Sequence, residues 1–434
     1  MSLTDMAIVR RSMAGRRFST ITTIAMVAIS VALMLTLLSL REAAQRRFQR
    51  GSGNMHLLVS GDTSRLVAVL NAVFHAGAPD RALPWTQILR MQADPRLEFV
   101  IPIQQGDSYR GLPVLATTRE FFTRFSPDPA FEPRDEEQEP WRRAWPFRAG
   151  RPFSAPMEAV LGAEAARLSG VGLGDRIALT HGRREEGHVH GEFPLEVVGV
   201  LGPTGTAHDR AVFVDLRASW LMHALERLER AGADISGLTA EDISDADRQV
   251  TGAYLRCVTR AGSSVSAVLP EIAYGLRRNP NLTVAEPRQE IDNLFRIVAN
   301  VDRILIAMAA VVMLASGASI MLALYNSMEQ RRRQTATLRV LGASAGRILR
   351  LVLIEATLLG AAGAAAGILL SGIGGVLVAA ALESRLGLVI DARIDPMAGI
   401  LVGLGAILVA SLGGLAPAVL AYRTGVANNL RPLG

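Results

Sequence analysis

Four long apolar stretches constrain this chain more than any other feature of its sequence. They cover residues 21–40, 304–324, 351–381 and 397–421, and each is at least twenty residues long. A helix of about twenty apolar residues can cross the hydrocarbon core of a bilayer, which is about 30 Å thick. We therefore expect an α-helical membrane protein with four transmembrane helices.

The distribution of arginine predicts how these helices are oriented. All 46 basic residues are arginine, because the sequence contains no lysine. Six arginines lie in the 325–350 loop and only two in the 382–396 loop, and cytoplasmic loops carry the excess of positive charge. This asymmetry places 325–350 in the cytoplasm, together with the N-terminal residues 1–20 and the tail 422–434. The large segment 41–303 and the short loop 382–396 are then outside.

The first apolar stretch, 21–40, is expected to remain in the protein as an anchor. Its twenty uncharged residues exceed the apolar region of a secretory signal peptide. Residues 41–46, which follow it, offer no small-residue cleavage site. We therefore count this stretch as the first transmembrane helix.

The external segment 41–303 has the pattern of a mixed α/β domain with two lobes. Its outer parts could pair as one ferredoxin-like lobe, with Asp62 or Thr63 capping the first helix. The strand and helix patterns of this lobe lie at 56–60, 62–74, 98–103, 112–117, 254–258, 264–278 and 282–285. A second, β-rich lobe occupies about 145–220, with strands at 159–162, 176–180, 195–201 and 211–215. Between the two lies an acidic, proline-broken segment, 126–140, which we expect to be a linker or a solvated insert.

The composition excludes several classes of activity. A P-loop places a lysine on the nucleotide phosphates and a Schiff-base enzyme needs an amine, so a chain without lysine is neither. The single Cys257 excludes an intrachain disulfide and a cysteine metal cluster. No HExxH, GxSxG or GxGxxG motif occurs. The arginines gather at membrane edges, which argues against nucleic-acid binding. We expect no catalytic residue and no cofactor in this chain.

The segment 329–344, EQRRRQTATLRVLGAS, is the most basic short loop of the chain. Residues 334–341 contain no helix breaker and place a mildly apolar face at helical spacing. Gly342 can adopt the positive φ that ends a helix, and Ser344 can cap the next one. These residues predict either a short helix along a membrane face or a plain charged loop.

The same segment resembles the signature of the FtsX-like ABC permeases, a family that also contains MacB-like and LolC/LolE-like subunits. The resemblance lies in the arginine run, in TLR and LGAS, and in a glutamate eleven residues after the last serine. It implies that the segment is a coupling helix seated on a separate ATPase. The residues that it assigns to this contact are Glu329, Arg331, Arg332, Arg333, Thr337, Leu338, Arg339, Leu341, Gly342, Ala343, Ser344 and Glu355.

Motifs of the external segment resemble the periplasmic core of MacB-like proteins. They are Gly150-Arg151-Pro152-Phe153, Gly172-Leu173-Gly174-Asp175, Val197-Val198-Gly199-Val200 and Gly205-Thr206-Ala207-His208-Asp209. This resemblance covers nearly the whole chain. It implies a multi-pass permease subunit in the bacterial inner membrane, with the large domain in the periplasm. It also implies a partner ATPase that binds ATP and magnesium, a second permease copy forming a homodimer, and a periplasmic or outer-membrane partner.

Glu355 lies about one turn inside the third apolar stretch, where a carboxylate is costly and usually functional. Its match to the family glutamate implies a structural role at the coupling site. The alternative is that it reaches the nearby membrane interface or pairs with Arg347 or Arg350.

Two small-residue motifs are expected to let helices pack closely in lipid. They pair Gly363 with Gly367 and Gly399 with Gly403, each at a spacing of four residues. Whether they pack within one subunit or between two stays open at this point.

Three histidines, His181, His188 and His190, surround a predicted hairpin tip. His188 and His190 alternate along the chain, so both side chains could point to one face of a strand. With His208 or Glu192 they could bind zinc. The alternative is a polar tip whose histidines face water.

Two stiff helices are expected to join the membrane to the external domain. Residues 289–324 contain no proline and a single glycine, and 42–49 contain no helix breaker.

The leading hypothesis is the permease subunit of an ABC transporter, which transmits ATPase motion to the external domain for export or for handling lipoproteins or peptides. The alternatives are an FtsX-like regulator of a periplasmic hydrolase and a membrane-anchored periplasmic metal-binding protein.

Overall fold

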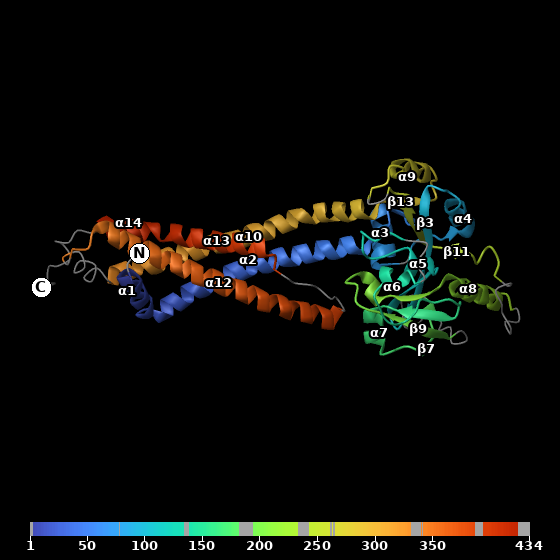
Figure 1. Cartoon of the computed structure of the whole chain (residues 1–434), viewed down its shortest axis with the longest axis horizontal. Coiled ribbons are helices and arrows are strands. Elements are labelled where there is room, and N and C mark those ends of the chain that lie inside the picture. The colour runs from blue at the N-terminus through green and yellow to red at the C-terminus, as the bar shows by residue number, and fades with distance from the viewer. Residues whose placement is uncertain are drawn as a thin grey trace. The chain divides into compact units, whose positions relative to one another are not determined.

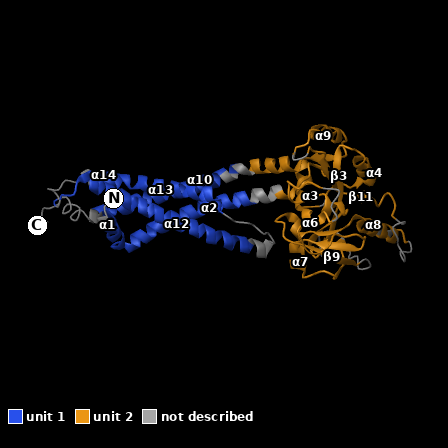
Figure 2. Ribbon diagram, in the orientation of Figure 1, with its two compact units in different colours: residues 1–44, 298–434 blue, residues 45–297 orange. Residues whose placement is uncertain are grey.

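The chain forms two compact units. The computed structural model describes residues 3–77, 79–133, 139–181, 194–232, 243–260, 263, 265–330, 340, 342–386 and 394–423 (Figure 1). Unit 1 comprises Met1–Ala44 and Val298–Gly434, and unit 2 comprises Gln45–Ile297 (Figure 2). This division lies within a few residues of the predicted boundary between the membrane part and the external domain.

Unit 1 contains the membrane-spanning helices. Its helices, two of which end or begin in unit 2, are α1 (Leu3–Ala14), α2 (Arg17–Gly51), α10 (Pro287–Gln330), α12 (Ala345–Leu386), α13 (Pro396–Gly413) and α14 (Leu415–Arg423). Among the described residues, four segments are long and apolar enough to cross a membrane, namely Arg17–Ala43, Arg303–Met328, Ala345–Ala381 and Pro396–Leu420. The prediction of four transmembrane helices is confirmed.

Some boundaries differ from those expected. Helix α1 was not predicted, and α12 starts before the expected third span and continues into the expected 382–396 loop. The fourth span divides into α13 and α14 at Gly414. Pro417 lacks the N–H that would bond to the carbonyl of Gly413, so the regular helix is interrupted there.

Glycines set the contacts among the helices of unit 1. A Cβ on Gly363 would lie 2.5 Å from Cβ of Val27, and one on Gly367 would lie 2.6 Å from Cβ of Val31. This motif therefore packs α12 against α2 within one subunit. A Cβ on Gly403 would meet its nearest neighbour at 3.7 Å, which is ordinary contact. The motif of Gly399 and Gly403 is therefore not a close crossing in this subunit.

Unit 2 is built on one long mixed sheet. In spatial order its strands are β13 (Thr283–Ala285), β1 (Leu57–Ser60), β12 (Gly252–Cys257), β3 (Leu97–Tyr109), β4 (Leu112–Thr117), β10 (Val212–Asp215), β6 (Glu158–Leu161), β9 (Leu195–Leu201) and β5 (Phe147–Gly150). Two short strands join it, β7 (Arg176–Ile177) on β9 and β8 (Thr180–His181) on β3. A separate pair is formed by β2 (Leu83–Pro84) and β11 (Gln249–Val250).

The two predicted lobes share this sheet. The first four strands, β13-β1-β12-β3, pair antiparallel throughout, in the order of a ferredoxin-like unit. Strands β10, β6, β9 and β5 belong to the predicted second lobe. They are joined to the first through the parallel pair of β4 and β10, in which Val212 faces Val114. One hydrogen-bonded sheet therefore carries both lobes.

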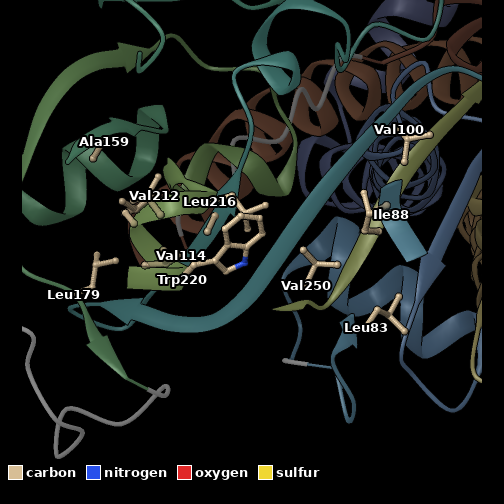
Figure 3. Packing of buried hydrophobic residues seen from close by; sticks show 14 of the residues in the cluster. Leu83, Ile88, Val100, Val114, Ala159, Leu179, Val212, Leu216, Trp220 and Val250 are labelled. Atoms are coloured by element: carbon tan, nitrogen blue, oxygen red, sulfur yellow. The ribbon is translucent and has the colours of Figure 1, made fainter. Parts of the chain in front are cut away.

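Side chains from both faces of the sheet are buried, because the strands alternate. In β1, Leu57 and Val59 belong to one hydrophobic cluster, and Leu58 belongs to the other. The first cluster, shown in Figure 3, is covered by α4 (Trp85–Gln92), α7 (Ala163–Ser169), α8 (Leu216–Arg230) and α9 (Leu269–Arg277). The second is rich in aromatic rings and is covered by α3 (Arg65–Phe74), α5 (Glu120–Thr123) and α6 (Trp141–Ala144).

Local predictions in unit 2 hold with small corrections. The cap of α3 is Ser64 rather than Asp62 or Thr63, and its side chain accepts a hydrogen bond from Val67 N at 3.2 Å. The predicted helix 264–278 is shorter, and the predicted strand 176–180 is two short strands. The segment 126–140 is anchored at its start, where Ser126 and Phe131 are buried. Residues 134–138 lie outside the described part.

Candidate functional site

The start of α12 is formed as its sequence predicts. Gly342 has a φ of +94°, in the left-handed region that favours glycine. Two residues later, the hydroxyl of Ser344 accepts a hydrogen bond from Arg347 N at 3.2 Å, as a helix cap does. Gly342 and Ser344 therefore fix the point where α12 begins.

A buried carboxylate on α1 holds this end of α12. Asp5 is 1% exposed. Its Oδ1 accepts from Arg347 Nε at 3.0 Å and from Nη2 at 2.7 Å, and its Oδ2 accepts from Arg350 Nη2 at 3.1 Å. Arginine presents a planar fork of donors, so one carboxylate can hold both helix-start arginines in a fixed geometry.

Glu355 forms a second link between α12 and the N-terminal segment. Ser12 Oγ donates to its Oε1 and Oε2 at 3.0 and 3.1 Å, and Arg16 Nη2 donates to Oε1 at 2.5 Å. The proposed pairing of Glu355 with Arg347 or Arg350 is wrong, because those two arginines bond to Asp5 instead. Successive helix positions turn by about 100°, so Arg350 and Glu355 point to different sides of α12.

Three helices meet around Glu355. A cavity of about 70 Å³ is lined by residues of α1, of the end of α10 and of the start of α12. Its walls are Ile8, Val9, Ser12, Leu324, Ser327, Met328, Ile348, Leu351, Val352 and Glu355. The volume exceeds that of a single water, so the three helix ends leave a small space beside Glu355.

Of the predicted coupling residues, the structure describes mainly those at the C-terminal end of the segment. Gly342, Ala343, Ser344 and Glu355 are described, and Glu329 lies in the last turn of α10. Arg331, Arg332, Arg333, Thr337, Leu338, Arg339 and Leu341 lie outside the described residues. Their assignment to an ATPase contact therefore stays a prediction.

The N-terminal half of this site was missed from the sequence. Asp5, Val9 and Ser12 are spaced by four and three residues, which puts them on one face of a helix. All three are buried, and no proline or glycine interrupts residues 2–14. The signal was present, but the spacing alone does not say that this polar face meets another helix.

Breaking the pair of Glu355 and Arg16 should be costly. Both side chains are largely buried, and an uncompensated buried charge costs about 3–5 kcal/mol. The arginines that bind Asp5 are 39% and 57% exposed, so breaking that contact should cost less. Together the two carboxylates couple the start of α12 to α1 and to the turn that precedes α2.

The histidine hypothesis is not supported for His208. His208 lies in the short 3₁₀ helix η1 (Ala207–Arg210), is fully buried and hydrogen-bonds to His75, with Nδ1 3.1 Å from Nε2. Phe121 and Trp145 surround its ring. It is thus a core residue and not a hairpin ligand. Only the backbone of His181 is described, in β8, and His188 and His190 lie outside the described residues, as does Glu192. No group of three metal-ligating side chains occurs in the part of the chain that the structure describes.

His75 and His208 belong to a chain of buried polar groups. Gln105 Nε2 lies 3.1 Å from His75 Nδ1 and donates to Asn71 O at 2.9 Å. Asn71 Nδ2 in turn donates to Asp62 Oδ1 at 2.8 Å. Burial, and then the neighbouring His75, hold the pKa of His208 well below its usual value. His208 is therefore neutral at pH 7.

The external motifs of the resemblance have structural roles. Gly150 has a φ of +76°, and a Cβ there would lie 2.1 Å from Val198 O. Arg151 donates to Glu158 at 2.6 and 2.9 Å, and this hydrogen bonding lowers the pKa of Glu158 to about 2. Asp209 accepts from Thr204 N and Gly205 N, each at 2.8 Å. These residues shape turns between strands.

The chain matches two family models. A model described as the MacB-like periplasmic core domain matches residues 20–273, and one described as the FtsX-like permease C-terminal matches residues 306–426. Among curated proteins, no match is found.

Two solved structures are similar to parts of the chain. The periplasmic region of MacB from Actinobacillus actinomycetemcomitans is 11% identical, with a TM-score of 0.32, and the match covers 58% of this chain and 95% of that one. The extracellular domain of the noncanonic ABC-type transporter YknZ from Gram-positive bacteria is 10% identical, with a TM-score of 0.27, and the match covers 53% and 97%.

The family models agree with what the residues themselves build. The MacB-like model spans more than half of the chain, and the FtsX-like model begins in the membrane-spanning part of α10 and ends just after α14. The four apolar helices and the mixed α/β unit fit these assignments. The chain therefore belongs to the MacB/FtsX-like family of ABC transporter permeases.

Proposed function

We propose that this chain couples a separate ATPase to its external domain by mechanical transmission. In this proposal the ATPase binds ATP and magnesium, sits on the 329–344 segment, and moves the start of α12. The chain lies in the inner membrane with unit 2 in the periplasm, and two copies pair around the ATPase. The output is export or the handling of a lipoprotein or peptide.

The observation that carries the proposal is the double link at the start of α12. Asp5 binds Arg347 and Arg350, and Glu355 binds Ser12 and Arg16. Movement of the coupling segment would pull directly on α12, and through these pairs on α1 and on the turn that leads into α2. In this proposal the carboxylates of Asp5 and Glu355 hold helices together and need not contact a substrate.

The lengths of α2 and α10 support the second step. They have 35 and 44 residues, or about 52 and 66 Å at 1.5 Å per residue. Both exceed the ~30 Å of hydrocarbon. An unbroken helix transmits tilt or rotation, whereas a flexible linker does not. These two helices are the proposed path to unit 2.

The test uses the complex of the chain with its cognate ATPase in nanodiscs. Glu355→Gln keeps the side-chain shape but removes the charge that Arg16 binds. We expect the complex to assemble, and its stimulated ATP hydrolysis to fall about tenfold, equivalent to about 1.4 kcal/mol. Arg16→Gln should have the same effect, and the double variant should be no worse than either single one, since both lose one interaction.

The matched control is Asp395→Asn, a carboxylate at the cap of α13. Asparagine caps a helix about as well as aspartate, so hydrolysis should stay at the level of the unmodified complex. Full stimulation in Glu355→Gln would remove Glu355 from the coupling path. Strictly additive losses in the double variant would show that Glu355 and Arg16 do not act through the bond between them.

A further inference from the structure

Unit 2 contains a positively charged cavity unrelated to the coupling residues. Its volume is about 480 Å³, within the range of sites that hold small organic ligands, roughly 300–1,000 Å³. It is lined by Arg50, Ser126, Pro127, Asp128, Pro129, Arg142, Arg143, Ala144, Trp145, Pro146 and Thr204. Three arginines against one aspartate give the lining an excess of positive charge.

Two of the arginines are held in place by aromatic rings. The guanidinium of Arg142 lies 4.6 Å from the centre of the Trp141 ring, and that of Arg143 lies 4.9 Å from the centre of Phe131. Arg142 also binds Glu139 at 2.5 Å, and Arg143 donates to Glu132 O at 2.8 Å. A guanidinium stacked on a ring is already oriented, so it loses little freedom when it binds an anion.

The third arginine extends from a different element. Arg50 lies in the last turn of α2 and its side chain is exposed. Among the described residues, no partner forms an ion pair or a hydrogen bond with its guanidinium. A cation of this kind has donors to offer an incoming anion without first breaking an internal bond.

The backbone behind the cavity is rigid. Trp145 is 1% exposed, and its Nε1 donates to Phe121 O at 3.0 Å and to Phe125 O at 2.9 Å. Ser126 Oγ donates to Ala144 O at 2.7 Å, and Asn54 accepts from Ser126 N at 3.0 Å. Three prolines add further backbone restraint. The cavity is therefore formed before any ligand arrives.

We propose that this cavity binds an organic anion, whose carboxylate or phosphate is held by Arg50, Arg142 and Arg143 and whose apolar part rests on Pro129 and Pro146. An inorganic anion would use only the arginines and leave the two prolines in water. A neutral ligand would leave the arginines without an acceptor. The site depends on unit 2 alone and does not rest on the proposed coupling.

The experiment uses four small probes that share one phenyl group. N-acetyl-phenylalanine carries a carboxylate, its amide is neutral, phenyl phosphate carries a phosphate, and phenethylamine carries a positive charge. Binding to the full chain in detergent is measured by ligand-observed NMR titration. We expect at least one of the two anions to bind about tenfold or more tightly than the amide, with no saturation by the amine. Whichever of the two anions binds more tightly shows whether the cavity prefers a carboxylate or a phosphate group.

Variants assign the binding to the cavity. Arg50→Gln/Arg142→Gln/Arg143→Gln should weaken anion binding about tenfold or more, whereas Arg50→Lys alone should keep most of it. The matched control Arg90→Gln/Arg176→Gln/Arg278→Gln removes three exposed arginines of unit 2 that do not line the cavity, and it should bind as the unmodified chain does.

Three results would overturn the proposal. They are equal affinity for the amide and the anions, unchanged affinity in the cavity variant, and no saturation by either anion up to about 10 mM, the weak end of specific binding. If the triple variant unfolds, Arg50→Glu replaces it, because this exposed side chain at a helix end is not needed for packing. Charge reversal there should abolish anion binding.

Discussion

At the residue scale, glycine decides how the membrane helices meet. In lipid there is little hydrophobic drive between helices, so close packing of small residues takes its place. Gly363 and Gly367 receive Val27 and Val31 of α2, and Gly360 receives Ala410 of α13, where an added Cβ would lie at 2.5 Å. A Cβ on Gly374 of α12 would meet nothing within 4 Å. Glycines on one helix therefore differ sharply in what they contribute.

This difference predicts opposite outcomes for two similar substitutions. Gly367→Val would place its Cβ 2.6 Å from Cβ of Val31 and 2.7 Å from Ala28 O. We expect a loss of about 1–3 kcal/mol, typical of overpacking. The measurement is the fraction of the chain that stays monodisperse in detergent after heating. Gly374→Val is the control, and it should melt as the unmodified chain does. Equal melting of the two variants would show that α2 and α12 do not pack as described.

The histidine pair in unit 2 makes a second prediction, on pH. Burial lowers the pKa of His208 in the folded state, below the usual value of about 6.5 expected when the chain is unfolded. The unfolded chain therefore binds more protons below that pH, and the stability of unit 2 should fall as the pH decreases from about 6.5. The slope from this group cannot exceed about 1.4 kcal/mol per pH unit.

The pH effect can be followed by tryptophan fluorescence, because Trp85, Trp141, Trp145 and Trp220 all lie in unit 2. The denaturation midpoint should fall between pH 7.5 and 5.5, ~1 unit on either side of the usual histidine value, and the fall should be shallower in His208→Gln. His223→Gln changes a half-exposed histidine on α8 and should keep the original slope. The same slope in all three proteins would mean that folding does not lower the pKa of His208.

At the element scale, the sequence predicts what local pattern controls. Strands β4 and β9 have the predicted bounds, and the four spans were found because apolar length is a direct property of sequence. Helix α10 was expected to be continuous, and it is. The helix is continuous because no proline interrupts it. This can be read from the sequence without knowing which other helices it packs against.

What could not be predicted depends on contacts between distant segments. The bond from Arg16 to Glu355 joins residues 339 positions apart, and Asp5 reaches Arg347 across 342. Spacing along one helix shows which face a side chain occupies but not which helix covers it. The sharing of one sheet by both lobes likewise rests on β4 and β10, whose strand patterns carry no sign of the pairing.

The continuity of α10 can be tested as a mechanical property. Val298→Gly/Ala299→Gly places two glycines in the helix, at a cost of about 1 kcal/mol each in helix propensity. In the reconstituted complex we expect ATP hydrolysis to persist. An environment-sensitive fluorophore on Thr86→Cys, an exposed position of α4, should however lose its response to ATP. The Val298→Ala control keeps helix propensity and should retain the response. A full response in the glycine variant would contradict transmission through α10.

At the scale of the whole molecule, charge and hydropathy divide the chain into the same two parts as its contacts. Unit 1 holds the four apolar helices. Unit 2 holds the mixed sheet, whose strands lie between α2 and α10 in the sequence. With four spans, three of them after unit 2, we expect the arginine-rich residues 325–350 in the cytoplasm with both termini, and unit 2 on the other side of the membrane.

This orientation predicts which introduced thiols a membrane-impermeant maleimide can reach in spheroplasts. Thr86→Cys on unit 2 should react in intact spheroplasts. Gly346→Cys, an exposed position where a side chain would meet nothing within 4 Å, should react only after permeabilisation. The native Cys257 can stay, because it is fully buried and burial, with the charge of Asp94, raises the pKa of its thiol to about 11. A thiol with so little thiolate reacts slowly, and the parent chain should remain unlabelled. Labelling of both variants in intact spheroplasts would refute the four-span arrangement, since residues 86 and 346 are separated by an odd number of spans in it.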